Sequence, residues 1–410
     1  MTASPIPRIA AIDLARLVAI VGMMCSHLLT EFTVLPGSLV TTMTHGFPST
    51  LFAVVAGVGS AIAADRPSRR GRDREAAGAQ LARGLTVALI GVALAAMPTF
   101  VAVVLVPLGV AIMVIAPLLR ATTATLSAIA IGLAITGPLL ISQIVEHQGM
   151  AERGPILRTI DGVLFTGVYP VITWVVYLIV GLLIGRAVLA ATRSGTRANT
   201  TANTTASLGG RLALAGIVGI AVATITDAIY VARFAGPALA AEIDAPVSIA
   251  IEMLRQSGYG TPHGGGWDAI LIAAPHTGTF LDIVRTVGGA AIVIGVLLAA
   301  VGSGSGRIMR SWPVRVLAAA GSAGLTIYVV HILTTVLLTA LAEEGVIEWE
   351  SWDLPALAFN LVVLLGLGVV LVVTGRRGPL EAVIRWAGQT GASVAAKTRK
   401  ATPAPRASKA

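Results

Sequence analysis

The first apolar stretch of the chain carries three polar side chains that share one side of a helix. Asp13, Arg16 and His27 lie in the segment RIAAIDLARLVAIVGMMCSHLLTEF, residues 8–32. Arg16 and His27 are eleven residues apart, so on a helix they fall on nearly the same line, separated by about 16 Å along the axis. Polar groups within a membrane usually face a protein interior or a wet cavity, so the stripe predicts a buried site. A purely structural Asp13–Arg16 pair, and His27 as a residue of the membrane interface, are the alternatives.

Histidines that neighbour Gly, Pro or Thr are the next candidates for chemistry. His45 precedes a second apolar stretch and is followed by Gly46. His276 precedes a later one, where Asp282 and Arg285 stand at the spacing i, i+3 that allows a pair on a helix. Imidazole is the side chain best suited to proton transfer near neutral pH. We therefore consider His45 and His276 as catalytic residues.

The depth of the histidines suggests how they are used. His27, His45 and His276 all fall near one side of the predicted membrane region, so we expect them to converge on one outward-facing cavity. His331 stands alone in the middle of a later apolar stretch, either as a hydrogen-bonded core group or as a functional one. We expect no metal, because no HExxH-like spacing occurs and Cys25 is the only cysteine.

The elements that position these residues are membrane-spanning helices. Hydrophobic residues make up 55% of the 410 residues and charged residues 12%, and the mean hydropathy is +0.86. Apolar runs near 20 residues recur along the chain, which predicts an all-α polytopic membrane protein and excludes a β-barrel, whose strands alternate. The net charge of +9 is concentrated in loops and at the C-terminal end, which suits anionic membrane lipids rather than nucleic acid.

About ten spans are predicted. The arginine-rich segments fall on one side, which places them and both termini in the cytoplasm. Tyr169, Thr173 and Tyr177 form a polar stripe on one of the spans. We expect a single transmembrane domain over residues 1–390 and a disordered basic cytoplasmic tail over 391–410. The expected spans are 9–32, 48–64, two short ones within 84–119, 122–145, 167–190, 212–231, 279–301, 317–341 and 354–374, with loops at 65–83 and 192–210.

Several short segments resemble one known family. RIAAIDLARLVAIVGMMCSH, THGFPSTLFAVVAGVGSA, APHTGTFLDIVRTVGGA, AGLTIYVVH and RRGPLEAVIRW are similar to bacterial membrane proteins related to heparan-α-glucosaminide N-acetyltransferase. The resemblance implies a transmembrane acyltransferase-like bundle. It also implies transfer of an acyl group, chiefly acetyl, from cytosolic acyl-CoA to a glycan or lipid acceptor outside the cytoplasm. His45 stands where the family has its central histidine, whereas Leu17 replaces the family's glycine.

In this interpretation His45 and His276 are catalytic, and the substrate-binding residues are Asp13, Arg16, His27, Asp282 and His331. The composition is typical of a high-GC bacterium, so we expect the protein in a bacterial inner membrane, acting on the cell envelope. The competing hypothesis is a proton-coupled transporter or flippase, in which Asp13, Arg16, Asp227 and His331 form a relay. A non-catalytic scaffold is a third alternative. The acceptor, the acyl chain and the oligomeric state do not follow from the sequence.

Overall fold

The computed structural model describes residues 10–29, 46–147, 155–194, 198–302 and 311–401. The described residues form helices and contain no strand. The long helices are α1 (Ala10–Leu28), α4 (Phe47–Arg69), α5 (Asp73–Ala95), α7 (Thr123–His147), α9 (Val171–Ser194), α10 (Ala198–Tyr230), α14 (Phe280–Gly302), α17 (Gly324–Glu343), α18 (Trp349–Thr374) and α19 (Pro379–Ala401). The shorter ones are α6 (Leu105–Val114), α8 (Pro155–Asp161), α11 (Gly236–Glu242), α12 (Val247–Leu254), α13 (Asp268–Leu271) and α16 (Trp312–Ser322).

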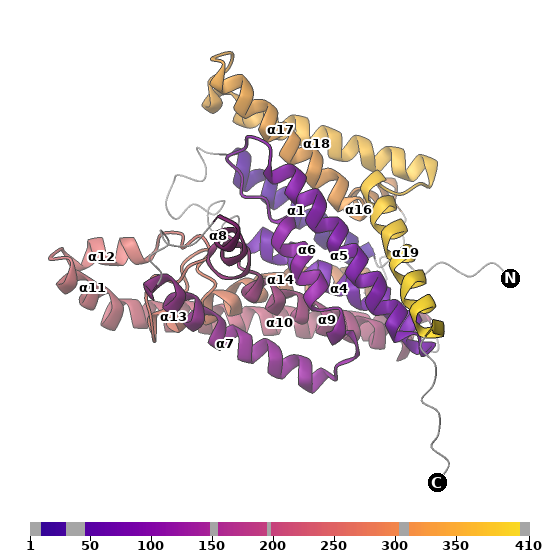
Figure 1. Cartoon of the computed structure of the whole chain (residues 1–410), viewed down its shortest axis with the longest axis horizontal. Helices are drawn as coiled ribbons and strands as arrows, with labels where there is room; N and C mark the ends of the chain where they lie inside the picture. The colour runs from indigo at the N-terminus through magenta and orange to yellow at the C-terminus, as the bar shows by residue number, and fades with distance from the viewer. Residues whose placement is uncertain (1–9, 30–45, 148–154, 195–197, 303–310, 402–410) are drawn as a thin grey trace, which may run out of the picture.

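The fold class predicted from the sequence is confirmed. Nine helices within the described ranges are long and apolar enough to cross a membrane. The tenth expected span is α6, which has ten residues and is therefore about 15 Å long, half of a bilayer's hydrocarbon core. Figure 1 shows α11 and α12 at one end of the molecule and α19 at the other.

Three segments predicted as irregular are helical instead. The arginine-rich segment 65–83 was expected as a loop, but α4 continues to Arg69 and α5 begins at Asp73. The polar linker 192–210 is helical from Ala198 onwards, because α10 begins there. Residues 391–401 of the expected disordered tail belong to α19, and residues 402–410 lie outside the described part. The arginine-rich segment and the tail are rich in alanine and in basic residues, which are good helix formers. The Thr- and Asn-rich start of α10 has low intrinsic propensity, and its helix extends cooperatively from the apolar residues that follow.

One expected span is interrupted. The stretch 317–341 divides into α16 and α17 at Ala323. Glu381 of α19 accepts hydrogen bonds from the backbone nitrogens of Leu325 and Thr326, at 2.7 and 3.1 Å, and from the Thr326 hydroxyl at 2.7 Å. A carboxylate at a helix N-terminus satisfies donors that the helix leaves unpaired. Glu381 therefore fixes where α17 begins, and α17 carries His331.

Glycines let the central helices touch backbone to backbone. A β-carbon on Gly57 of α4 would collide with the Leu178 carbonyl oxygen, and one on Gly181 of α9 with that of Val54. Close approach at paired glycines is a common way for membrane helices to pack, because lipid supplies no hydrophobic force between them. This contact holds α4 against α9, and both helices line the site described below. By contrast, α10 buries only 17% of its most apolar window, as expected for a helix that faces lipid.

Candidate active site

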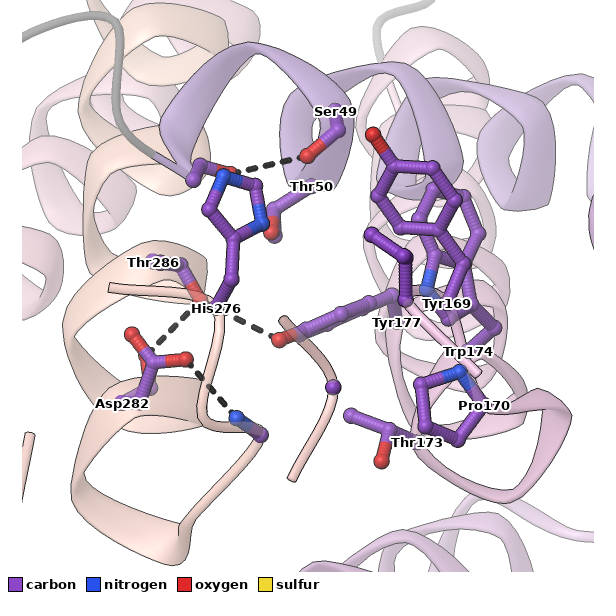
Figure 2. A pocket seen from close by; sticks show the side chains of 14 residues that line it. Ser49, Thr50, Tyr169, Pro170, Thr173, Trp174, Tyr177, His276, Asp282 and Thr286 are labelled. Atoms are coloured by element: carbon purple, nitrogen blue, oxygen red, sulfur yellow. Dashed lines mark hydrogen bonds between the residues drawn. The ribbon is translucent and has the colours of Figure 1, made fainter. Parts of the chain in front are cut away.

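A small cavity lies where four segments meet, and Figure 2 shows the side chains that line it. Its volume is about 30 Å³. Its walls come from the first turn of α4, the segment before α9 and α9 itself, the loop around Gly260, and the segment that enters α14. The lining residues are Gly46, Ser49, Thr50, Val168, Tyr169, Pro170, Thr173, Trp174, Tyr177, Gly260, His276, Gly278, Asp282 and Thr286.

His276 is presented to this cavity by a tight turn. Ala274, Pro275, His276 and Thr277 form the turn, which is closed by bonds from the Thr277 nitrogen and hydroxyl to the Ala274 carbonyl oxygen at 3.4 and 2.7 Å. His276 has φ = +55°, at the third position, where turns with proline second usually have glycine. A non-glycine residue in the left-handed region is strained by about 1–2 kcal/mol. An imidazole kept at such a position points to a functional use.

The turn is held from a second side by the loop around Gly260. The Gly260 nitrogen donates to the His276 carbonyl oxygen at 2.6 Å, and the Gly258 nitrogen donates to that of Pro275 at 2.9 Å. Gly260 has φ = +93°, and a β-carbon there would collide with the Gly167 carbonyl oxygen. The ring of Tyr169 meets the His276 ring edge to face, with centroids 6.3 Å apart.

Asp282 joins the turn to α14. Its Oδ2 accepts the Gly278 nitrogen at 3.1 Å, and its Oδ1 accepts Arg285 Nη2 at 2.8 Å, which confirms the predicted i, i+3 pair. Asp282 is only 2% exposed. The Arg285 guanidinium in turn lies over the Phe47 ring, 5.6 Å from its centre, at the start of α4. A cation over an aromatic face is attracted by the ring quadrupole, so the pair also ties α14 to α4.

The opposite wall is aromatic and rich in hydroxyl groups. The predicted stripe of Tyr169, Thr173 and Tyr177 faces the cavity, and Trp174 packs edge to face against both tyrosines. Burial raises the pKa of Tyr169, which lies just before α9, to about 12, so its hydroxyl stays protonated at neutral pH and can donate. The Thr173 hydroxyl is buried and makes no hydrogen bond to any described residue, which leaves it for a bound molecule.

The first turn of α4 brings the position after His45 to the cavity. His45 itself lies outside the described residues, so its predicted catalytic place stays a prediction. Its neighbour Gly46 has φ = +86°, and a β-carbon on it would lie 3.6 Å from Thr286 Cγ2 and 4.0 Å from the His276 nitrogen. Gly46, the residue after His45 in the sequence, therefore lies against the turn that carries His276 and against α14.

His27 is not placed as expected. It does not line the cavity, and it bonds instead to His331, with His27 Nδ1 and His331 Nε2 3.0 Å apart. The two rings are nearly coplanar, at 3°, and their centroids are 5.3 Å apart. That separation is the nitrogen–nitrogen distance plus two ring radii, so the rings lie edge to edge in one plane and are not stacked face to face. His27 still interacts electrostatically with His276. His331 is hydrogen-bonded, as one of the two sequence-based alternatives for it predicted.

Asp13 and Arg16 form the expected partnership at the other end of α1. Arg16 Nη1 lies 3.0 Å from Asp13 Oδ1 and also donates to the Gly321 carbonyl oxygen at 3.2 Å. Gly324 of α17 leaves the space that the Arg16 side chain fills. The predicted ion pair is confirmed, but neither residue lines the cavity. Their role with a substrate stays a prediction.

A buried ion pair beside the site joins Asp227 to a residue that the sequence does not identify. Asp227 of α10 is buried, accepts the Ala273 nitrogen at 2.8 Å with Oδ1, and pairs with Arg255 through Oδ2. The turn that carries His276 begins at the next residue, Ala274. The sequence marks Asp227 as an acid inside a span, but nothing in it identifies Arg255, 28 residues away, as the partner.

A model of one protein family, described as heparan-alpha-glucosaminide N-acetyltransferase, catalytic, matches residues 8–217, about half of the chain. The match runs from α1 into α10, so it contains His27, His45 and the α9 wall but ends before His276 and His331. No curated protein and no solved structure matches the chain.

Proposed function

We propose, because this chain belongs to the heparan-α-glucosaminide N-acetyltransferase family, that it transfers an acetyl group from cytosolic acetyl-CoA to an acceptor outside the cytoplasm. The observation that carries the proposal is the strained His276 turn, which faces Gly46, the residue that follows His45 in the sequence. The acceptor is a glycan or a lipid of the cell envelope. Both termini lie in the cytoplasm, the protein resides in the bacterial inner membrane, and membrane lipids surround it.

The chemistry is attack of a hydroxyl or amine on a thioester. A bond forms between the acceptor oxygen or nitrogen and the acetyl carbonyl carbon, and the carbon–sulfur bond of acetyl-CoA breaks. His45 accepts the proton that the acceptor loses, and the departing CoA thiolate takes up a proton in turn. His276 and the Tyr169 hydroxyl are donors for the oxyanion that develops on the carbonyl oxygen.

The arginine-rich end of the bundle is the entry for the donor. The exposed Arg69 ends α4, and the exposed Arg70 and Arg72 follow it. Arg16 of α1, by contrast, lies beside Gly59 in the middle of α4. Guanidinium groups bind phosphates through paired hydrogen bonds, which suits the phosphates of CoA. Arg16 and His27 are about 16 Å apart along α1, so the extended arm of acetyl-CoA has to run along this helix to reach the histidines.

The deciding experiment is acetyl transfer in oriented vesicles. Inverted and right-side-out membrane vesicles containing the protein are given acetyl-CoA labelled in the acetyl group, and labelled envelope glycans and lipids are then separated. We expect label only when acetyl-CoA reaches the cytoplasmic face, with the product on the other face. Uptake driven by a pH gradient without acetyl transfer would instead support a transporter and overturn the proposal. A vesicle set lacking the protein is the control.

Replacing His276 by glycine should separate stability from activity. Glycine adopts φ = +55° without strain, which gains about 1–2 kcal/mol, and loses about 0.4–1 kcal/mol through the entropy of the unfolded chain. We therefore expect an unfolding free energy that is unchanged or up to about 1.5 kcal/mol higher, together with loss of acetyl transfer. Thermal unfolding in detergent and the vesicle assay measure the two quantities. His276→Ala, which keeps the β-carbon, should not be stabilised, and a fully active His276→Gly protein would contradict the role of the imidazole.

A further inference from the structure

We propose that Asn360, His331 and His27 form a hydrogen-bonded chain that fixes the tautomer of His27. In this chain His27 carries its proton on Nδ1 and leaves Nε2 as a proton acceptor for the transfer reaction. His331 and Asn360 are positioning residues, since they act through His27. The role in transfer rests on the proposed function, whereas the tautomer itself does not.

The chain begins at an asparagine buried in α18. Asn360 is 1% exposed, and its Nδ2 donates to the Ala356 carbonyl oxygen at 2.9 Å. This bond sets the orientation of the amide, because a flipped amide would place its oxygen against that carbonyl oxygen. Asn360 Oδ1 is then the atom left to accept a bond, and it has no other partner among the described residues. A buried acceptor without a partner is costly, so a donor belongs there.

The donor is His331. Its side chain, on the neighbouring α17, interacts with Asn360. Its Nδ1 is buried and makes no hydrogen bond within the described part of the chain other than this interaction. Asparagine Oδ1 can only accept, so His331 must carry a proton on Nδ1 to satisfy both atoms. A neutral imidazole with a proton on Nδ1 has its lone pair on Nε2.

The last link follows from the bond between the two imidazoles. His331 Nε2 holds a lone pair and lies 3.0 Å from His27 Nδ1, so His27 Nδ1 is the donor. The coplanar rings give this bond a direct path. Neutral His27 then has its lone pair on Nε2, on the side of the ring away from His331. That nitrogen takes over the proton that His45 has accepted from the acceptor, and the proton then leaves with the CoA thiol.

Nitrogen NMR of the protein in bilayers tests the tautomers without any activity. With ¹⁵N-labelled histidine, we expect His27 and His331 each to show a protonated Nδ1 and an unprotonated Nε2, assigned by comparison with His27→Gln and His331→Gln. In Asn360→Leu the acceptor is lost, so both rings should shift to include the other tautomer, whereas Asn360→Asp should keep the native one. A protonated Nε2 on His27 in the unaltered protein, or unchanged signals in Asn360→Leu, would overturn the proposal.

Kinetics test the positioning role. Holding a catalytic histidine in the wrong tautomer lowers turnover by up to about 10⁴-fold, and a mixture of tautomers lowers it in proportion to the competent population lost. We therefore expect Asn360→Leu to lower kcat severalfold with little change in KM. Asn360→Asp should restore most of the activity. Thr334→Val is the matched control, because Thr334 is on the same helix as His331 but does not belong to the hydrogen-bonded series Asn360–His331–His27. Equal loss in Asn360→Leu and Thr334→Val would contradict the role. Absence of acetyl transfer from the unaltered protein would remove the proposed function and leave the tautomer result standing.

Discussion

His45→Ala is expected to lower acetyl transfer by about 10²–10⁴-fold, the usual effect of losing a general base. The reason is position: Gly46, the next residue, packs beside Thr286 and the His276 backbone at the cavity. The overall fold should be unaffected, since the first described residues of α4 are held by the Ser49 hydrogen bond to Gly46 and by the cation–π contact of Phe47. Labelled acetyl transfer in vesicles and thermal unfolding in detergent measure the two effects.

His147→Ala is the matched control for this variant. His147 ends α7, is exposed, and bonds through Nδ1 to the Gln143 carbonyl oxygen at 2.9 Å. It does not line the cavity, so its replacement should leave transfer within twofold of the unaltered protein. If His45→Ala keeps full activity while His276→Ala loses it, the general base is not His45.

Hydropathy predicts most of the membrane helices of this chain because burial in lipid requires an uninterrupted apolar run. It does not predict how far a helix continues beyond the membrane. The segment 65–83 is polar and arginine-rich, yet α4 and α5 occupy nearly all of it. Nor does hydropathy reveal the break at Ala323, which depends on Glu381 of a distant helix bonding to the start of α17.

The candidate site is predictable only where its residues are neighbours in the sequence. The pair Asp282–Arg285 and the stripe through Thr173 follow from helical spacing. The bond between His27 and His331 joins positions 304 residues apart, and no local pattern indicates it. The sequence gives one sign of the strain at His276: Pro275 suits the second position of a turn whose third position usually holds glycine, and here that position holds His276. The sequence alone does not show that the turn forms.

Asp282→Ala is expected to be the most destabilising single change at the site. Asp282 and Arg285 are 3% and 17% exposed in their side chains, and Asp282 also holds the Gly278 nitrogen. Removing one partner of a buried ion pair usually costs about 3–5 kcal/mol, because the other charge stays buried and unpaired. We expect a loss of that size in the unfolding free energy, measured by unfolding in detergent, and loss of transfer because the His276 turn loses its tie to α14.

A second replacement identifies the source of this loss. In the Asp282→Ala protein, Arg285→Leu removes the unpaired guanidinium, so the double variant should recover part of the stability that the single variant loses. What is not recovered measures the bond from Asp282 to the Gly278 nitrogen, about 1–3 kcal/mol for an amide left without its acceptor. Asp282→Asn keeps an oxygen that can accept the Gly278 amide, so its unfolding free energy should lie between those of the Asp282→Ala protein and the unaltered protein. A single variant that unfolds within 1 kcal/mol of the unaltered protein, with transfer intact, would mean that Asp282 neither pairs with Arg285 nor supports the turn in the membrane.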